Sequence, residues 1–145
     1  MEMTMKLTPL APLPLMLAMA CTLETPAPIV APTAQSFAAA ATVADLKALG
    51  ATKLDAAGIT QEVAGQNFEE VGGRWIWNIL ADGSQNSAAT DGSWSEDRVR
   101  WTITSDQYCR AAPGNMPKCS DVYQLGDLFR WTEDDGLAEW SVIRQ

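Results

Sequence analysis

The chain has 145 residues, a formal net charge of −8 and no histidine. The negative charge disfavours binding to nucleic-acid phosphates and to anionic lipid, because like charges repel. The lack of histidine removes the commonest general base, the commonest zinc ligand and every nucleophile that depends on histidine. We therefore predict no catalytic residues, no metal site, no cofactor and no nucleic-acid partner.

The N-terminal residues are typical of an export signal. Lys6 precedes the uncharged stretch from Leu7 to Ala20, whose 14 residues are too few to cross a bilayer as a helix but suit the apolar part of a signal peptide. Ala18-Met19-Ala20 fits the small residues that a signal peptidase requires. We therefore predict a signal peptide over 1–20, which directs the chain to export.

Cys21 directly follows the predicted cleavage site. The run from Leu17 to Cys21 resembles a bacterial lipobox, in which the cysteine becomes lipidated. The alternative is ordinary cleavage that leaves Cys21 unmodified, and both alternatives stay open. A lipid anchor at Cys21 is the one membrane attachment that we predict. By the same resemblance, Thr22 after the cysteine implies sorting to the outer membrane. We therefore expect a location in the bacterial cell envelope, either periplasmic or lipid-anchored to the outer membrane.

Two segments precede the region of alternating pattern. Residues 21–41 are rich in proline and alanine and lack apolar periodicity, which predicts a disordered tether. Residues 42–65 form a short helical segment in our prediction, because Thr42 to Asp45 is similar to a capping box and Gly50 can end the helix. A second, weaker helical turn is expected between Thr60 and Gly65.

Apolar and polar residues alternate over much of 66–145, and pairs of aspartate and glycine interrupt the alternation. A period of two is typical of strands with one buried face, and these pairs favour hairpin turns because they tolerate positive φ. The predicted strands are 74–79, 93–95, 98–104, 122–125, 128–132 and 138–143. The predicted turns are Asp82-Gly83, Asp91-Gly92, Gly126-Asp127 and Asp135-Gly136.

The sequence thus predicts a mainly β fold: an antiparallel meander that curls into a small barrel or sandwich, with one or two short N-terminal helices. One face should form the core and the other should be wet. The predicted core face comprises Trp75, Trp77, Ile79, Val99, Trp101, Ile103, Phe129, Trp131, Ala138, Trp140 and Val142. The predicted wet face comprises Arg74, Asn78, Arg98, Arg100, Thr102, Arg130, Thr132, Glu139 and Ser141.

Cys109 and Cys119 flank a loop that contains proline and glycine, from Arg110 to Lys118. Their spacing matches no redox motif, and two thiolates without histidine make a poor metal site. We therefore predict a structural disulfide between them, and closing such a loop stabilises a chain by about 3 kcal/mol. The bridge would belong to the β domain over 66–145.

Three further groups of residues could carry function. Arg74, Arg98, Arg100 and Arg130 could form an anion-binding pocket, and the alternative is pairing across strands with acids such as Glu69 and Glu139. The tryptophans could stack on sugars, although their alternation favours the core, with Trp94 as the expected exception. The carboxylates at 133–135 and 96–97 are interpreted as solvated turns rather than cation sites.

Several short motifs, taken in order, resemble one known family. The motifs are Gly92-Ser93-Trp94, Gln107-Tyr108-Cys109, Cys119-Ser120-Asp121-Val122-Tyr123 and Gly126-Asp127. They are similar to those of a family of small exported proteobacterial proteins of unassigned function, over about residues 60–145. The resemblance implies a compact antiparallel β domain with one disulfide, and it supplies no catalytic residues.

Location, size and missing catalysts favour a non-enzymatic envelope module that binds a protein partner or a cell-wall component, or that contributes to the cell surface. The alternative is an inhibitor of a protease or lysozyme, whose loop from Arg110 to Lys118 would enter a cleft. A third hypothesis is a carboxylate-dependent glycan hydrolase.

Overall fold

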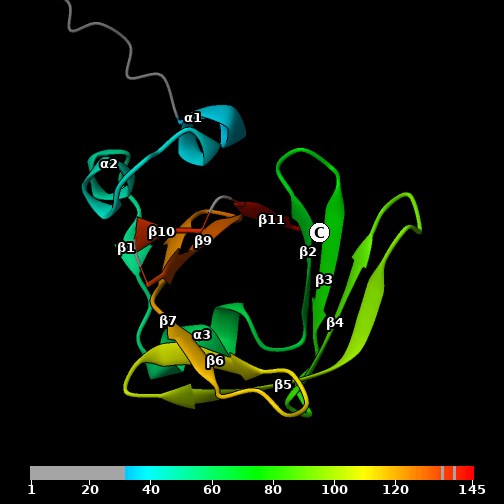
Figure 1. Ribbon diagram of the computed structural model, residues 1–145. Helices are drawn as coiled ribbons and strands as arrows, with labels where there is room; N and C mark the ends of the chain where they lie inside the picture. Colours follow the sequence, from blue (N-terminus) through cyan, green and yellow to red (C-terminus); the bar gives the residue numbers. More distant parts are fainter. Residues whose placement is uncertain (1–31, 135, 139) are drawn as a thin grey trace, which may run out of the picture. The chain divides into compact units, whose positions relative to one another are not determined.

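The computed structural model describes residues 32–134, 136–138 and 140–145 (Figure 1). The predicted signal peptide, Cys21, the first part of the predicted tether and Glu139 lie outside the described residues. No helix in the described ranges has both the length and the apolar character needed to span a membrane.

Antiparallel strands make up most of the described chain. They are β1 (Thr52–Lys53), β2 (Gln66–Glu70), β3 (Trp75–Ile79), β4 (Ser84–Ala89), β5 (Ser95–Thr104), β6 (Gln107–Ala111), β7 (Lys118–Ser120), β8 (Val122–Leu125), β9 (Leu128–Glu133), β10 (Gly136–Leu137) and β11 (Val142–Arg144). Their order in the sheet is β1-β8-β9-β11-β2-β3-β4-β5-β6-β7, with β10 paired beside β9. The predicted mainly β, antiparallel fold is confirmed.

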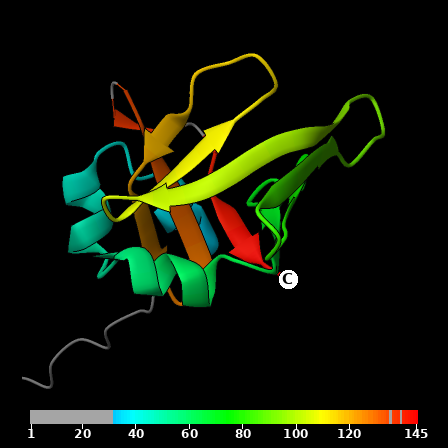
Figure 2. The same cartoon turned by 90° about the horizontal axis from the view of Figure 1, so that it is seen from below.

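The sheet curls into a half-barrel (Figures 1 and 2). β7 pairs only with β6, yet it lies next to β9, so the two parts of the sheet approach each other without forming a ladder. Asp121, between β7 and β8, bridges this approach: its backbone N–H donates to Thr132 Oγ1 at 2.9 Å, and its carboxylate pairs with Lys53 at 2.9 Å. The curled sheet therefore has a defined inner face.

Three short helices precede the curled sheet or join its first strands: α1 (Ala34–Ala38), α2 (Val43–Ala48) and α3 (Ala56–Glu62). α2 begins as predicted, because Thr42 and Asp45 exchange the reciprocal hydrogen bonds of a capping box. α3 begins earlier than the predicted turn at Thr60, because Asp55 caps its first turn and Asp106 accepts from the N–H of Ala56 at 2.8 Å.

α1 corrects the tether prediction for 21–41 at its C-terminal end. Thr33 and Ser36 form a capping box, and the ring of Phe37 is completely buried. Composition alone suggested disorder, because alanine and proline dominate this segment. Tertiary packing of Phe37 in the core supplies stability that so short a helix lacks by itself.

The core has two parts, on opposite faces of the sheet. The inner part includes Phe68, Tyr108, Phe129 and Trp131 together with Ile59 of α3. The outer part is formed where α1 and α2 cover the sheet, and it comprises Phe37, Ala40, Leu46, Ala51, Tyr123 and Leu128. β9 is consequently buried on both faces, which the meander prediction did not include.

The predicted faces otherwise agree with the structure. Every residue of the predicted core face is buried or half-buried, and Trp94, the expected exception, is 44% exposed. On the predicted wet face, Arg130 and Ser141 are instead buried, at 5% and 3% exposure. Arg130 lies on the face of β9 that α1 covers, which accounts for this difference.

Candidate binding cavity

A cavity of about 360 Å³ opens on the inner face of the half-barrel. Its walls come from β2, β3, β4, β6, β7 and β9 and from the residues around β11. Five aromatic side chains line it: Phe68, Trp77, Tyr108, Trp131 and Trp140. The curling of the sheet thus gathers rings that lie far apart in the sequence.

The tryptophans of the wall form one continuous aromatic surface. Trp77 and Trp140 are stacked with ring centroids 4.9 Å apart, and Trp140 also contacts Trp131 at 5.4 Å. Trp131 meets the ring of Phe68 edge-on at 5.9 Å. Trp77 and Trp140 are only half-buried, and both line the cavity.

A buried chain of hydrogen bonds lies beside the rings. Tyr108 donates its hydroxyl to Gln85 Oε1 at 2.6 Å, and Gln85 Nε2 donates to Ser87 Oγ at 3.0 Å. Burial raises the pKa of the Tyr108 phenol well above its usual range, so the hydroxyl stays protonated and acts as a donor. The side chain of Gln85 is 3% exposed and lines the cavity.

The indole N–H of Trp131, unlike the polar groups of this chain, is not hydrogen-bonded to any described residue. Its Nε1 atom is buried and has no hydrogen-bond partner among the described residues. A buried donor without a partner costs about 1–3 kcal/mol relative to a satisfied one. Unsatisfied buried groups are rare in native proteins, and they concentrate where function requires them.

Charged residues occupy the edge of the cavity. Arg110 of β6 and Lys118 of β7 stand directly opposite each other across the ladder, and both line the cavity. Glu133 and Asp134, at the end of β9, line it as well. In the part of the chain that the structure describes, these four residues form no ion pair with one another.

The disulfide between Cys109 and Cys119 is confirmed. The two residues are cross-strand partners on β6 and β7, with Cα atoms 3.9 Å apart. Cys119 also lines the cavity. The bridge therefore fixes the two strands that carry Tyr108, Arg110 and Lys118.

The predicted anion pocket of four arginines is wrong for Arg130. Its guanidinium donates to the carbonyls of Phe37, Ala38 and Ala40, at 3.3, 2.9 and 2.9 Å. It also donates twice to the carbonyl of Ala138, at 2.9 and 2.7 Å. The guanidinium thus joins the C-terminal end of α1 to the backbone at Ala138. Its burial lowers the pKa of Arg130.

The other three predicted anion-binding arginines have separate surroundings. Arg74 forms an ion pair with Glu70 at 2.7 Å, so it pairs with an acid as the alternative proposed, although the acid is neither Glu69 nor Glu139. Arg98 and Arg100 are exposed on β5. Neither is among the cavity-lining residues, whereas Arg110, which sequence reasoning left in a loop, is.

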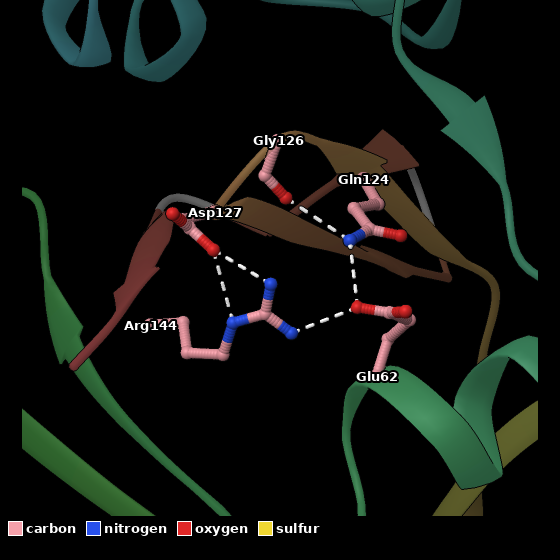
Figure 3. Close-up of polar contacts among 5 residues, drawn as sticks. All are labelled: Glu62, Gln124, Gly126, Asp127 and Arg144. Atoms are coloured by element: carbon pink, nitrogen blue, oxygen red, sulfur yellow. Dashed lines mark hydrogen bonds and ion pairs between the residues drawn. The ribbon is translucent and has the colours of Figure 1, made fainter.

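A second polar cluster lies outside the cavity (Figure 3). Arg144 of β11 pairs with Glu62 of α3 at 2.8 Å and with Asp127 at 2.6 Å, and Gln124 donates to Glu62 at 3.2 Å. The hydrogen bond from Arg144 holds the pKa of Glu62 below its usual value. Each group has a partner, so the cluster serves to join α3, β11 and the turn between β8 and β9.

Two signals in the sequence could have indicated the cavity. Trp77, Trp131 and Trp140 all fall on the predicted core face, and Arg110 follows the inward-facing Tyr108 by two residues. Gln85 had no such signal, because β4 was not predicted. Among the described residues, no three side chains of histidine, cysteine, aspartate or glutamate gather as a metal site would require.

Comparisons of this chain with protein-family models, with curated proteins and with solved structures find no match. These comparisons therefore identify no family for this chain. The chain is a tryptophan-rich antiparallel β half-barrel with one disulfide, whose inner face holds an aromatic cavity.

Proposed function

We propose that this protein is a non-enzymatic binding module of the bacterial cell envelope, whose cavity takes the apolar part of a small ligand. The observation that carries the proposal is the aromatic cavity of about 360 Å³. Sites for small molecules have volumes of roughly 300–1,000 Å³, apolar and aromatic walls and a few polar groups that orient the ligand. Tyr108 and Gln85 are polar groups of this kind.

The envelope location rests on the signal-like N-terminus and on the disulfide, because disulfides persist in oxidising compartments. Membership of the exported family and a lipid anchor at Cys21 belong to the same proposal. Intact-mass measurement of the mature protein from its native host tests the anchor. A diacyl or triacyl adduct on Cys21 supports it, and an unmodified chain that starts after Ala20 contradicts it.

The apolar surface that a ligand buries against the cavity wall supplies the driving force, at about 25 cal/mol per Å². The half-buried rings of Trp77 and Trp140 offer flat faces, and stacking between rings adds roughly 0.5–1.5 kcal/mol per pair. We therefore expect a ligand with a planar, apolar body. This differs from the sequence interpretation, which favoured burial of all these rings in the core.

Calorimetric titration of the protein with the uncharged ligand 3-(2-naphthyl)propanamide tests this function. We expect binding to one site, and Trp140→Ala should weaken it at least about tenfold, because the indole of Trp140 lines the cavity. Trp94→Ala is the matched control, since Trp94 is exposed and does not line the cavity. Absence of binding, or equal loss in both variants, would contradict the proposal.

One observation favours inhibition of a hydrolase as a second candidate function. The loop between β6 and β7 projects from the body of the domain, with the disulfide at its base and the side chain of Met116 86% exposed (Figure 2). Inhibition of lysozyme or of a serine protease that Met116→Asp abolishes would support this function. Equal inhibition by the unsubstituted protein and by the Met116→Asp variant would contradict a role for the loop.

A further inference from the structure

Two cations line the cavity on paired strands: Arg110 is half-buried on β6 and Lys118 is exposed on β7. Arg110 follows Tyr108 by two positions on β6, so strand alternation puts both on the inner face. Arg110 is paired in register with Trp101 on one side and with Lys118 on the other. Like charges directly opposite each other across a ladder are destabilising. The arrangement therefore carries a cost that an anionic group between the two cations would relieve.

The acids lie on the other side of the same cavity. Glu133 follows Trp131 by two positions on β9 and shares its face, and Asp134 comes next along the chain. β7, which carries Lys118, lies next to β9 without pairing to it. Cations thus belong to the β6–β7 side of the opening and carboxylates to the β9 side.

These opposite charges do not neutralise each other directly. No ion pair joins the two sides in the described part of the chain. An opening with separated charges of both signs complements a ligand head that carries both signs as well. A cavity near the lower end of the volume range for small-molecule sites suits one ring-bearing side chain beneath such a head.

From this arrangement we infer that the ligand is a small zwitterion of the aromatic α-amino acid kind. Its apolar ring enters the cavity, its carboxylate lies beside Arg110 and Lys118, and its ammonium group lies beside Glu133 and Asp134. This inference rests on the proposed function, since it assigns a chemical class to the ligand of the same cavity. It also gives a reason for the cross-strand pair of cations.

Charged residues that point inward near a sheet edge have another known effect, which is to prevent edge-to-edge association. β7 is an edge strand, so Lys118 could act in this way alone. The two accounts differ in one measurable respect. If the charges protect the edge only, the charge of a ligand head has no influence on binding.

Four ligands with one naphthyl body separate these accounts: 3-(2-naphthyl)alanine, 3-(2-naphthyl)propionate, 2-(2-naphthyl)ethylamine and the uncharged 3-(2-naphthyl)propanamide. Calorimetric titration of the full chain should rank the zwitterion first, about tenfold tighter than the amide. The preference should shrink as salt increases, because these charges are near solvent. Equal affinity of all four, or an ion of one sign that binds as tightly as the zwitterion, would overturn the inference.

Variants that remove charge test which side chains lie beside the carboxylate of the ligand and which lie beside its ammonium group. Arg110→Gln with Lys118→Gln should weaken binding of the zwitterion and the anion, and Glu133→Gln with Asp134→Asn should weaken binding of the zwitterion and the cation. Neither pair should change binding of the amide. Arg98→Gln and Asp97→Asn are the controls, because both residues are exposed on β5 and lie outside the cavity lining. Uniform loss of all four ligands would contradict the assignment.

The amide keeps the two proposals distinguishable. If the amide binds and head charge has no effect, the binding function stands and the zwitterion inference fails. If no member of the series binds, both fail.

Discussion

Both faces of β9 contact buried residues, but the two faces differ in how completely their polar groups are hydrogen-bonded or paired. On the outer face, the guanidinium of Arg130 donates to four carbonyls, from Phe37, Ala38, Ala40 and Ala138. On the inner face, the indole N–H of Trp131 has no partner among the described residues, and the charges at the cavity opening are not paired with each other.

This contrast distinguishes polar groups that stabilise the fold from polar groups that we propose to be near a ligand. Stability favours full satisfaction of buried polar groups, so a saturated region such as that of Arg130 needs no ligand to explain it. An incompletely satisfied region costs stability, and such costs are found mainly where function repays them. The site that we propose for ligand binding lies on the inner face, where polar groups are less completely paired, and the following predictions test each face of β9.

The largest effect is expected at Arg130. Arg130→Met keeps the apolar stem but removes every donor to the end of α1, so we expect a loss of about 4 kcal/mol in the free energy of unfolding. Chemical denaturation measures the loss, and hydrogen exchange should show α1 opening first. Arg98→Met, on the exposed part of β5, should change stability by less than about 0.5 kcal/mol. Equal losses in the free energy of unfolding for Arg130→Met and Arg98→Met would contradict a special role of Arg130 in holding α1.

The disulfide comes next. Replacing both Cys109 and Cys119 with serine should lower the free energy of unfolding by about 3 kcal/mol, because the unfolded chain regains the freedom of the closed loop. The β6–β7 wall of the cavity should also loosen, so ligand affinity should fall even under conditions where the protein stays folded. Unchanged affinity in the folded variant would show that the bridge does not position the wall.

A smaller effect is expected from Tyr108→Phe. The change leaves Gln85 Oε1 without its donor while keeping the ring, so we expect a loss of about 1.5 kcal/mol. Tyr123→Phe is a matched control, since Tyr123 is also buried and its hydroxyl forms no hydrogen bond to the described residues. Urea unfolding of both variants decides whether the chain from Tyr108 to Ser87 belongs to the satisfied part of the inner face.

The smallest effect on the free energy of unfolding is expected at Glu62, which lies on neither of the two compared faces of β9. Its pKa is held below the ordinary value of 4.5, so its ion pair stabilises the fold above that pH, and the contribution disappears as pH falls through the lowered pKa. Glu62→Gln should cost about 0.5 kcal/mol at neutral pH, as for other partly exposed pairs, and nothing in strong acid. Glu69→Gln, at a half-buried glutamate without an ion pair in the described ranges, controls for loss of a carboxylate. A cost independent of pH would contradict this account.

Sequence reasoning succeeded where aromatic residues alternate with polar ones. β3 and β9 carry aromatic residues on one face, and both were predicted. β5, with Trp101, was predicted in two pieces, 93–95 and 98–104, whereas the structure has one continuous strand. β4 was missed because Ser84–Ala89 contains no large apolar residue, although Gln85, Ser87 and Ala89 are buried. Small and polar side chains face inward there, which leaves room for the rings opposite them.

The cavity and the role of Arg130 depend on facts that alternation does not encode. The pattern assigns a residue to a face, but it does not give the curvature that leaves space between Trp77, Trp131 and Tyr108. It also assigned Arg130 to a wet face, since the covering helix α1 lay in a segment of low-complexity composition. The disulfide was predictable because two cysteines around a short loop have few alternatives.

The most direct test of the cavity is a nuclear magnetic resonance titration that follows the indole N–H signals of all six tryptophans with 3-(2-naphthyl)propanamide. The signals of Trp77, Trp131 and Trp140 should shift with one common dissociation constant, while that of Trp94 stays in place. Shifts at Trp94 alone, or no saturable shift at the three cavity residues, would contradict binding on the inner face.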